Sequence, residues 1–264
     1  MSAEYLEFGS LLAEQAGEIM QAERDGYLDI QQKPDRTLVT RVDLAIQDLA
    51  IDEIVRNFPG HTIIGEERTY GSPDAEHIWR IDPLDGTGEY IEGGDPNDLT
   101  YGFGLAKQRG DELELGLFFN PSRVELYTAV HGLGAFLNGQ RINVNRDEFK
   151  PGITYDFTHW PSSLGDAHSL ETTIGPPLNY FSAIYQACTV ARGGSAFSVF
   201  LGRTAHDIAP GSILVQEAGG RVSDIYGRPH NWRSEPYGAV HSNGVTHSGA
   251  LSAIELPSAN PKDC

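Results

Sequence analysis

The chain has 264 residues, of which 39% are hydrophobic, and this length and composition suit a globular protein with a packed core. Its formal net charge of −18, from 37 acidic and 19 basic residues, argues against nucleic-acid polymers and anionic membranes as partners. The amino terminus lacks the basic start and apolar centre of a secretion signal, and no apolar run has membrane-spanning length, so we expect a cytoplasmic protein.

Two amphipathic helices are predicted in the first part of the chain. Apolar residues recur at helical spacing over residues 4–24 and again over residues 42–57, where Phe58-Pro59-Gly60 ends the pattern. A polar turn that contains Lys33 connects the two helices. We expect this turn to reach back over a site, and we take Lys33 itself to be a solvated side chain.

Two apolar runs that follow these helices both end in carboxylates. Residues 61–65 lead into Glu66 and Glu67, and residues 79–81 lead into Asp82. If both runs are strands, their ends deliver these acids to one point, where a hard divalent cation can be bound by oxygen atoms.

The second run continues as Asp82-Pro83-Leu84-Asp85-Gly86-Thr87, which places two carboxylates three residues apart. Two divalent ions about 3.5–4 Å apart need a bridging carboxylate. We assign Asp82 as the bridge, with Glu66 on one ion and Asp85 on the other. Gly86 and Thr87 would offer backbone N–H groups to a phosphate if they open a helix. The alternative is an ordinary acidic surface turn.

The rest of the chain mixes strands and helices. Residues 98–139 are rich in β-branched and aromatic residues divided by turn signals, which predicts an antiparallel meander. The later segments are predicted as strands at 151–159, 169–174, 187–190, 221–223 and 237–241, and as helices at 196–201, 207–218 and 245–256. Because no repeat or long linker is evident, we predict one mixed α/β domain over residues 1–264, with candidate subdomains at about 1–148 and 149–264.

Asp207 stands where the helix over residues 207–218 is predicted to begin. An acid at this position stabilises a helix start and needs no further role, and spacing alone favours that interpretation. A second metal ion, however, would need a third carboxylate beside Asp82 and Asp85, so both interpretations stay open at this point.

Three separated motifs, taken together and in this order, resemble the inositol monophosphatase family. They are Gly65-Glu66-Glu67, then Asp82-Pro83-Leu84-Asp85-Gly86-Thr87, and finally Asp207-Ile208-Ala209-Pro210-Gly211 through Glu217-Ala218-Gly219-Gly220. The resemblance spans nearly the whole chain. It implies a five-layer αβαβα sandwich of the sugar-phosphatase type and Mg²⁺-dependent, lithium-sensitive hydrolysis of a phosphate monoester by a homodimer.

The resemblance also implies a set of metal ligands for two or three Mg²⁺ ions. Glu66, Asp82 and the Leu84 carbonyl would bind the first ion, and Asp82, Asp85 and Asp207 would bind the second. Glu67 would hold a further, weak ion or support the other ligands.

The remaining implied roles concern catalysis and the substrate. Asp43 and Thr87 would be paired to orient the attacking water, so that the implied catalytic residues are Asp43, Glu66 and Thr87. The implied substrate contacts are Gly86 and Thr87 at the phosphate, Gly194, Ser195 and Ala196 at the alcohol, and Asp207.

Several positions depart from the inositol phosphatase pattern and leave the substrate open. Phe200 occupies the place of an acid that contacts sugar hydroxyls, and His206 replaces a tryptophan. Because Phe200 cannot hydrogen-bond to sugar hydroxyls as an acid would, inositol phosphate itself is a weaker candidate for the substrate. Gly88-Glu89 is closer to the bisphosphate nucleotidases, although Gly88 replaces their lysine. We therefore expect a small phosphorylated alcohol, such as an inositol or sugar phosphate, with a 3′(2′),5′-bisphosphate nucleotidase acting on phosphoadenosine phosphate as the alternative.

Two other classes compete with this interpretation. Leu84-Asp85-Gly86-Thr87 superficially resembles the nucleophile loop of haloacid-dehalogenase phosphatases, but that chemistry needs two acids two residues apart, and Asp82 and Asp85 are three apart. A non-catalytic metal-binding protein that has kept the fold is the second alternative, which the changes at Phe200 and His206 permit.

Overall fold

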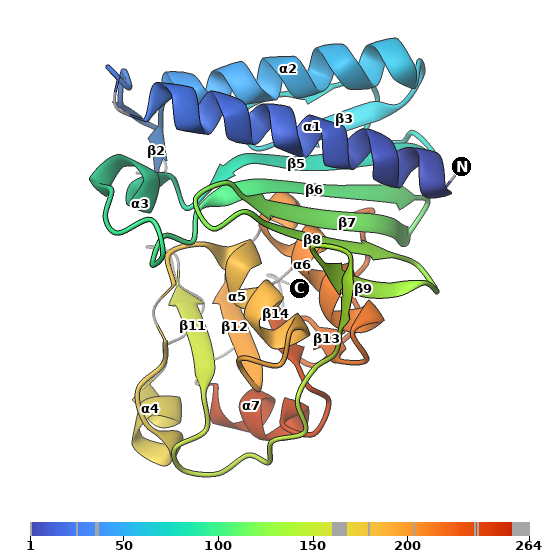
Figure 1. The fold of residues 1–264 in the computed structure, drawn as a ribbon. Helices are drawn as coiled ribbons and strands as arrows, with labels where there is room; N and C mark the ends of the chain where they lie inside the picture. The colour runs from blue at the N-terminus through green and yellow to red at the C-terminus, as the bar shows by residue number, and fades with distance from the viewer. Residues whose placement is uncertain are drawn as a thin grey trace.

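The computed structural model describes residues 2–24, 26–34, 37–159, 168–178, 180–202, 204–234, 236 and 238–254. Its helices and sheets stack in five layers (Figure 1). An outer pair of helices covers an eight-stranded sheet, a second pair lies between this sheet and a four-stranded one, and two short helices cover the far side. This order confirms the mixed α/β, αβαβα sandwich that the resemblance implied.

The outer pair is α1 (Ser2–Glu23) and α2 (Arg41–Asn57), both close to the predicted bounds. Their buried faces pack on the large sheet, where Leu12 and Ile46 share one core with Leu105 and Leu117. Only one stripe of each helix is buried, which is why the helical period is visible in the sequence. Within the described ranges, no helix combines the length and apolar character needed to cross a membrane.

The large sheet brings the two predicted acidic strand ends together. Its order is β10 (Gln140–Ile142), β9 (Gly134–Leu137), β8 (Glu125–Val130), β7 (Glu112–Asn120), β6 (Gly102–Arg109), β5 (His77–Asp85), β3 (Thr62–Gly65) and β4 (Thr69–Tyr70). Strands β6 to β9 confirm the predicted meander. Because β3 and β5 run parallel, with Gly65 beside Ile81, the residues that follow both strands meet at one edge.

The middle helices are α5 (Ala183–Ala191) and α6 (Ala205–Glu217), and they lie directly against the large sheet. Glycines in the sheet permit this close approach. A Cβ atom at Gly104 would lie 2.2 Å from Ile184 Cδ1, and one at Gly116 would lie 2.7 Å from the Pro210 carbonyl oxygen. The amino-terminal ends of both helices are thereby held near the edge where β3 and β5 end.

The small sheet and its outer helices complete the fold. The sheet order is β11 (Tyr155–His159), β12 (Phe197–Leu201), β14 (Ala239–Ser242) and β13 (Arg221–Ser223). The outer helices are α4 (His168–Ile174) and α7 (His247–Ala253), while a hairpin of β1 (Gln31–Gln32) and β2 (Leu38–Val39) and the short helix α3 (Thr87–Glu92) flank the large sheet.

Three predicted elements of the second half are wrong in type. Residues 169–174 lie in helix α4, residues 187–190 lie inside helix α5, and the helix predicted over 196–201 is strand β12 from Phe197 to Leu201. Residues 184–191 of α5 and all five residues of β12 are buried. Burial on every side removes the alternation of polar and apolar residues, so periodicity cannot separate helix from strand in such runs.

Element ends also differ from the predicted ones. Helix α6 begins at Ala205, so Pro210 lies beyond its first turn rather than inside it. The last predicted strand and helix are observed from Ala239 and His247, while Tyr237 and residues 255 and 256 lie outside the described part of the chain.

Candidate metal centre

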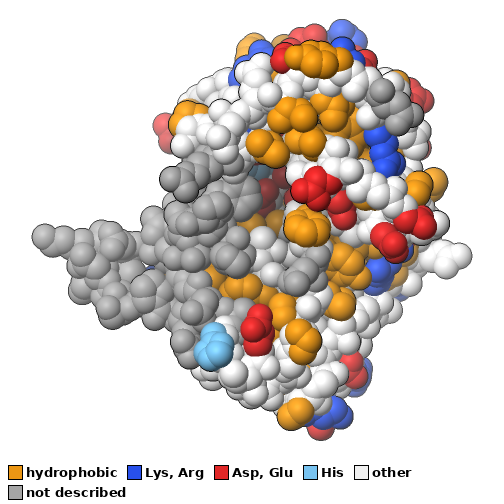
Figure 2. Space-filling view, turned by 90° about the vertical axis from the view of Figure 1, so that its left-hand side faces the viewer, with side chains coloured by type: hydrophobic (Ala, Val, Ile, Leu, Met, Phe, Trp, Pro, Cys, Tyr) orange, Lys and Arg blue, Asp and Glu red, His pale blue; other side chains and the backbone are white. Residues whose placement is uncertain are grey.

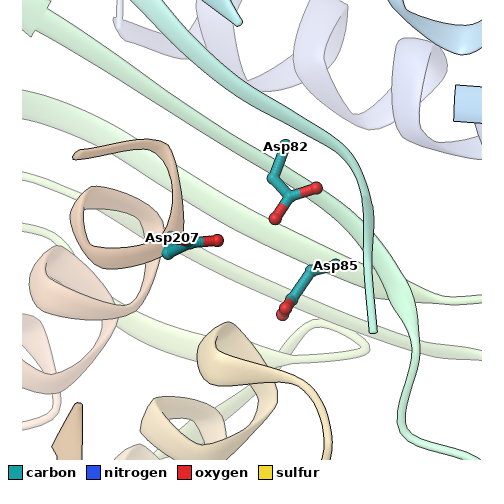
Figure 3. Close-up of side chains that lie close together, drawn as sticks. All are labelled: Asp82, Asp85 and Asp207. Carbon is teal, nitrogen blue, oxygen red and sulfur yellow. The ribbon is translucent and has the colours of Figure 1, made fainter. Parts of the chain in front are cut away.

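Three aspartates converge where β5 ends against the start of α6 (Figure 3). Asp82 and Asp85 come from β5 and Asp207 from the first turn of α6, and one carboxylate oxygen of each lies within 4.8 Å of the others. Asp82 is 2% exposed and Asp85 6% exposed. These three carboxylates, two of them buried and the third half-buried, present only hard oxygen donors, which is the donor set of Mg²⁺ and similar divalent ions.

An irregularity in β5 allows both of its aspartates to face this point. In a regular strand, residues three apart point to opposite faces of the sheet. The pairing of β5 with β6 shifts register between Asp82 and Asp85, where Pro83 cannot donate to the ladder. Asp82 Oδ1 accepts a hydrogen bond from the Leu84 amide at 3.0 Å, and this bond holds the backbone of the irregular part of β5.

Asp85 is held by the amino-terminal end of α5. Its carboxylate accepts hydrogen bonds from the Ser182 hydroxyl, from the Ala183 amide at 3.0 Å and from the Ile184 amide at 2.9 Å. Burial nevertheless dominates over these donors and, with Asp207 nearby, raises the pKa of Asp85 to about 8. A bound cation would relieve this crowding of negative charge.

The carboxylate of Asp82 has more negatively charged neighbours than that of Asp85. Complete burial, followed by the neighbouring carboxylates of Glu66, Asp85 and Asp207, raises its pKa well above the usual range. These shifts show that the site favours protons or cations over free carboxylates.

Asp207 is not the cap of α6. Thr204 occupies the N-cap position, and its hydroxyl donates to Asp207 Oδ2. His206 Nε2 lies 3.9 Å from the same oxygen. The carboxylate of Asp207 lies close to those of Asp82 and Asp85. Its place in the first turn of α6 also agrees with the helix-start interpretation, so the two interpretations are compatible.

Lys33 bridges the two glutamates that follow β3. Its Nζ lies 2.6 Å from Glu66 Oε1 and 2.6 Å from Glu67 Oε1. Burial alone would lower the pKa of Lys33, but the two carboxylates outweigh burial and raise it. The expectation of a solvated Lys33 is wrong, because the β1–β2 hairpin brings this side chain to Glu66 and Glu67.

Asp43 and Thr87 form a second polar contact beside the aspartates. Asp43 is fully buried, and its Oδ2 accepts from the Thr40 amide at 2.8 Å and the Thr40 hydroxyl at 2.6 Å. Thr87 Oγ1 lies 3.2 Å from Asp43 Oδ1 and 2.8 Å from the Leu84 carbonyl oxygen. Burial raises the pKa of Asp43 to about 6.

Gly86 links these two groups of polar residues. Its φ of +85° lies in the left-handed region, which glycine adopts without strain, and it allows α3 to begin directly at Thr87. The predicted helix start after the Asp85-Gly86 turn is therefore confirmed.

A cavity of about 520 Å³ opens over the site. Its lining includes the acids Glu66, Asp82, Asp85 and Asp207 together with Gly86 and Thr87, and also aromatic residues before α5 and in the small sheet. Figure 2 shows this side of the molecule, where hydrophobic side chains gather across the middle with acidic side chains among them and most basic ones lie toward the margins.

Three of the predicted substrate contacts lie elsewhere. Gly194, Ser195 and Ala196 follow the carboxyl-terminal end of α5, whereas its amino-terminal end touches the site. Nine helical residues separate the two ends by about 13 Å. The Ser195 hydroxyl instead donates to Asp156 Oδ2 at 2.6 Å inside the small-sheet half. These residues are not among those that line the cavity.

Phe181, Ser182 and Ala183, at the amino-terminal end of α5, lie at the site instead, and none of them is among the residues predicted from the sequence. Phe181 and Ala183 line the cavity, and Ser182 binds Asp85. A serine directly before an apolar run is a helix N-cap signal. The apolar run after Ser182 is predicted to contain a strand at residues 187–190, so the sequence pattern does not indicate Ser182 as the start of a helix.

Comparison with known proteins identifies related chains over nearly the full length. The model of the inositol monophosphatase family matches residues 1–256. The chain is 32% identical over 222 residues to the fructose-1,6-bisphosphatase/inositol-1-monophosphatase of Thermotoga maritima, with 83% of each chain covered. It is also 32% identical over 234 residues to Nus factor SuhB of Pseudomonas aeruginosa, covering 81% of this chain and 83% of the relative. The crystallised Thermotoga maritima inositol monophosphatase matches with a TM-score of 0.83 and 28% identity, covering 95% of this chain and 96% of that one.

Proposed function

Because the chain belongs to the inositol monophosphatase family, a family of metal-dependent phosphatases, we propose that it hydrolyses the phosphate monoester of a small alcohol with the help of Mg²⁺. The observation that carries this proposal is the convergence of Asp82, Asp85 and Asp207 at one side of an open cavity. A site of this kind binds cations and leaves room for a phosphate beside them.

The donor set fits such a cation site. The first ion would be held by Glu66, Asp82 and the Leu84 carbonyl, the second by Asp82, Asp85 and Asp207, with Glu67 at a third ion or as a support. Thr87 Oγ1 is within hydrogen-bond distance of both the Leu84 carbonyl and Asp43, and its one proton can point to either, so the Leu84 carbonyl keeps at least one free lone pair for an ion. Bound divalent ions would lower the pKa of a water molecule and offset the charge of the phosphoryl oxygens.

The chain's own residues would position the reactants. Thr87 would accept a hydrogen bond from the attacking water and donate its own proton to Asp43, which is mostly ionised at neutral pH because its pKa is about 6. Glu66 would complete the catalytic set at the neighbouring strand end, and the Gly86 and Thr87 amides would face the phosphate. The water oxygen forms a bond to phosphorus and gives up one proton, the ester P–O bond breaks, and the departing alcohol oxygen takes up one proton, so that the step consumes one water and leaves no net proton.

The bisphosphate nucleotidase alternative receives less support. A second phosphate needs a cationic partner. The described residues that line the cavity include neither lysine nor arginine. We therefore favour a monophosphate over phosphoadenosine phosphate.

Phosphate release from a panel of esters tests the proposal. The purified chain with Mg²⁺ is given inositol, sugar and nucleoside monophosphates and phosphoadenosine phosphate. Release that requires Mg²⁺ and falls at millimolar lithium supports the proposal. If no ester releases phosphate, the result supports the alternative of a non-catalytic metal-binding protein instead.

The resemblance also leads us to propose that residues 1–264 act as one domain and that the chain forms a homodimer. Light scattering coupled to size-exclusion chromatography measures the mass in solution. A mass of about twice 28.8 kDa is expected.

A further inference from the structure

We propose that the alcohol of the substrate carries a planar aromatic group, which stacks on a wall formed by Tyr180, Phe181 and Phe200. The inference rests on the proposed phosphatase function and names the class of alcohol that this site would take. The three residues are called the aromatic wall below.

The aromatic wall lies next to the place proposed for the phosphate. Tyr180 and Phe181 directly precede Ser182 and Ala183, whose hydroxyl and amide bind Asp85. Phe200 lies on β12 and is only 3% exposed, and the small part of it that is exposed lines the same cavity as Asp82 and Asp207. An ester whose phosphate lies at the aspartates would therefore extend its alcohol part along these rings.

Two of the three wall residues are supported by contacts with neighbouring elements. The Tyr180 ring packs edge-on against Tyr185 of α5, with centroids 5.2 Å apart and an interplanar angle of 86°. Gln186 donates to the Tyr180 carbonyl at 2.8 Å and to the hydroxyl of Thr158, the register partner of Phe200. A fixed aromatic surface loses little entropy when a flat ligand binds to it.

Phe181 is 70% exposed although it lines the cavity. An exposed phenyl ring at a cavity mouth gains most when a ligand covers it, because aromatic rings stack favourably on planar groups. A planar ligand stacked on Phe181 would cover this ring.

A polyol would be a poor occupant of this wall. Its hydroxyls need hydrogen-bond partners, and burying them against rings leaves them unpaired. Phe200 and Phe181 offer none. The hydroxyl of Thr158, which accepts from Gln186, can still donate, and Tyr180 has one phenol, so this side of the cavity offers few partners for the several hydroxyls of a polyol. The wall chemistry thus favours an aromatic alcohol, such as a nucleoside, over an inositol.

Matched pairs of esters test this inference. Adenosine 5′-monophosphate and ribose 5-phosphate share the same reacting ester and differ in the aromatic base. Benzyl phosphate and cyclohexylmethyl phosphate differ in planarity of the ring. We expect kcat/KM to be at least tenfold higher for the aromatic member of each pair, mainly through a lower KM.

The outcomes separate the two proposals. An enzyme that is active on polyol or sugar phosphates but does not discriminate within either pair overturns the aromatic inference alone. A chain that hydrolyses no ester of the wider panel overturns the phosphatase function on which the inference rests.

Substitution at the exposed ring sharpens the test. Phe181→Ala is expected to lower kcat/KM for adenosine 5′-monophosphate by about 5- to 100-fold while changing ribose 5-phosphate hydrolysis less than about twofold. Phe181→Trp should restore the preference. Tyr70→Ala removes a ring that is 48% exposed on β4 and does not line the cavity, and it should leave both rates unchanged. An equal loss on both substrates in Phe181→Ala would show a structural role and overturn the inference.

Discussion

Thr87 Oγ1 lies 3.2 Å from Asp43 Oδ1, which joins the first residue of α3 to the first turn of α2. Through this contact a helix of the outer layer reaches the polar group beside the three aspartates. The Thr40 capping box of α2 fixes the other oxygen of Asp43, so the start of α2 sets the position of the Thr87 hydroxyl.

Loss of the Thr87 hydroxyl is expected to slow the chemical step. Thr87→Ala should reduce kcat roughly 100-fold or more with little change in KM, because positioned proton transfer contributes about 10²–10⁴-fold in enzymes. Thr87→Ser keeps the hydroxyl and should retain most of the rate. Steady-state phosphate release measures both variants, and a Thr87→Ala enzyme with normal kcat would remove Thr87 from the mechanism.

Asp85→Asn is expected to abolish most turnover while the fold persists. The substitution removes a negative charge from the proposed second ion site and resembles the protonated acid, which a pKa of about 8 already favours at neutral pH. Calorimetric titration with Mg²⁺ should show weakened binding, and the melting temperature without metal should stay close to that of the unchanged protein. Asp74→Asn, on the exposed surface, serves as the matched control. Full activity in Asp85→Asn would contradict the two-ion assignment.

Metal binding should tighten as the pH rises from about 6 to 9. Asp82, Asp85 and Glu66 all have raised pKa values, chiefly through burial, so a cation must displace protons at low pH. Calorimetry in buffers of different ionisation enthalpy measures the protons released. Binding that is independent of pH over this range would show that these carboxylates are not the ligands.

The same shift predicts a pH effect on stability without metal. The pKa of Asp85 is about 8 when folded and about 3.8 in its ordinary state, so the folded chain binds more protons between these values. The contribution of Asp85 to stability is therefore present at low pH and lost as the pH rises toward 8. Urea unfolding at pH 6.5 and 8.5 should show a decrease without Mg²⁺ and a smaller one, or none, in Asp85→Asn.

Two buried histidines should make the folded chain less stable as the pH falls, whereas Asp85 makes it less stable as the pH rises. Burial lowers the pKa of His241 to about 3 and of His247 to about 4, and serine hydroxyls surround both rings. The unfolded chain then takes up more protons below about pH 6.5, so stability is lost as the pH falls from there toward 4. Each histidine contributes about 2 kcal/mol of this loss at pH 5. His241→Gln should flatten the fall in unfolding free energy between pH 7 and 5, and an unchanged slope would assign the effect elsewhere.

The sequence by itself determined the features that depend on neighbouring residues in the chain. Helices α1 and α2 bury one stripe each, so their period is visible in the sequence. The acids that follow β3 and those in the last part of β5 come directly after apolar runs, which the sequence also shows. The order of the motifs was enough to indicate the family and with it the five layers. Asp82, Asp85, Glu66 and Asp207 were therefore named before their geometry was known.

Only the tertiary structure decided which distant segments complete the site. Ser182 reaches Asp85 across 97 positions of sequence, and Lys33 reaches Glu66 across 33. The displacement of Gly194, Ser195 and Ala196 likewise depends on α5 being a helix, which its continuous burial concealed. Periodicity records how much of a segment is exposed, but it carries no information about which other segment covers it, and that pairing is set by the packing of the layers.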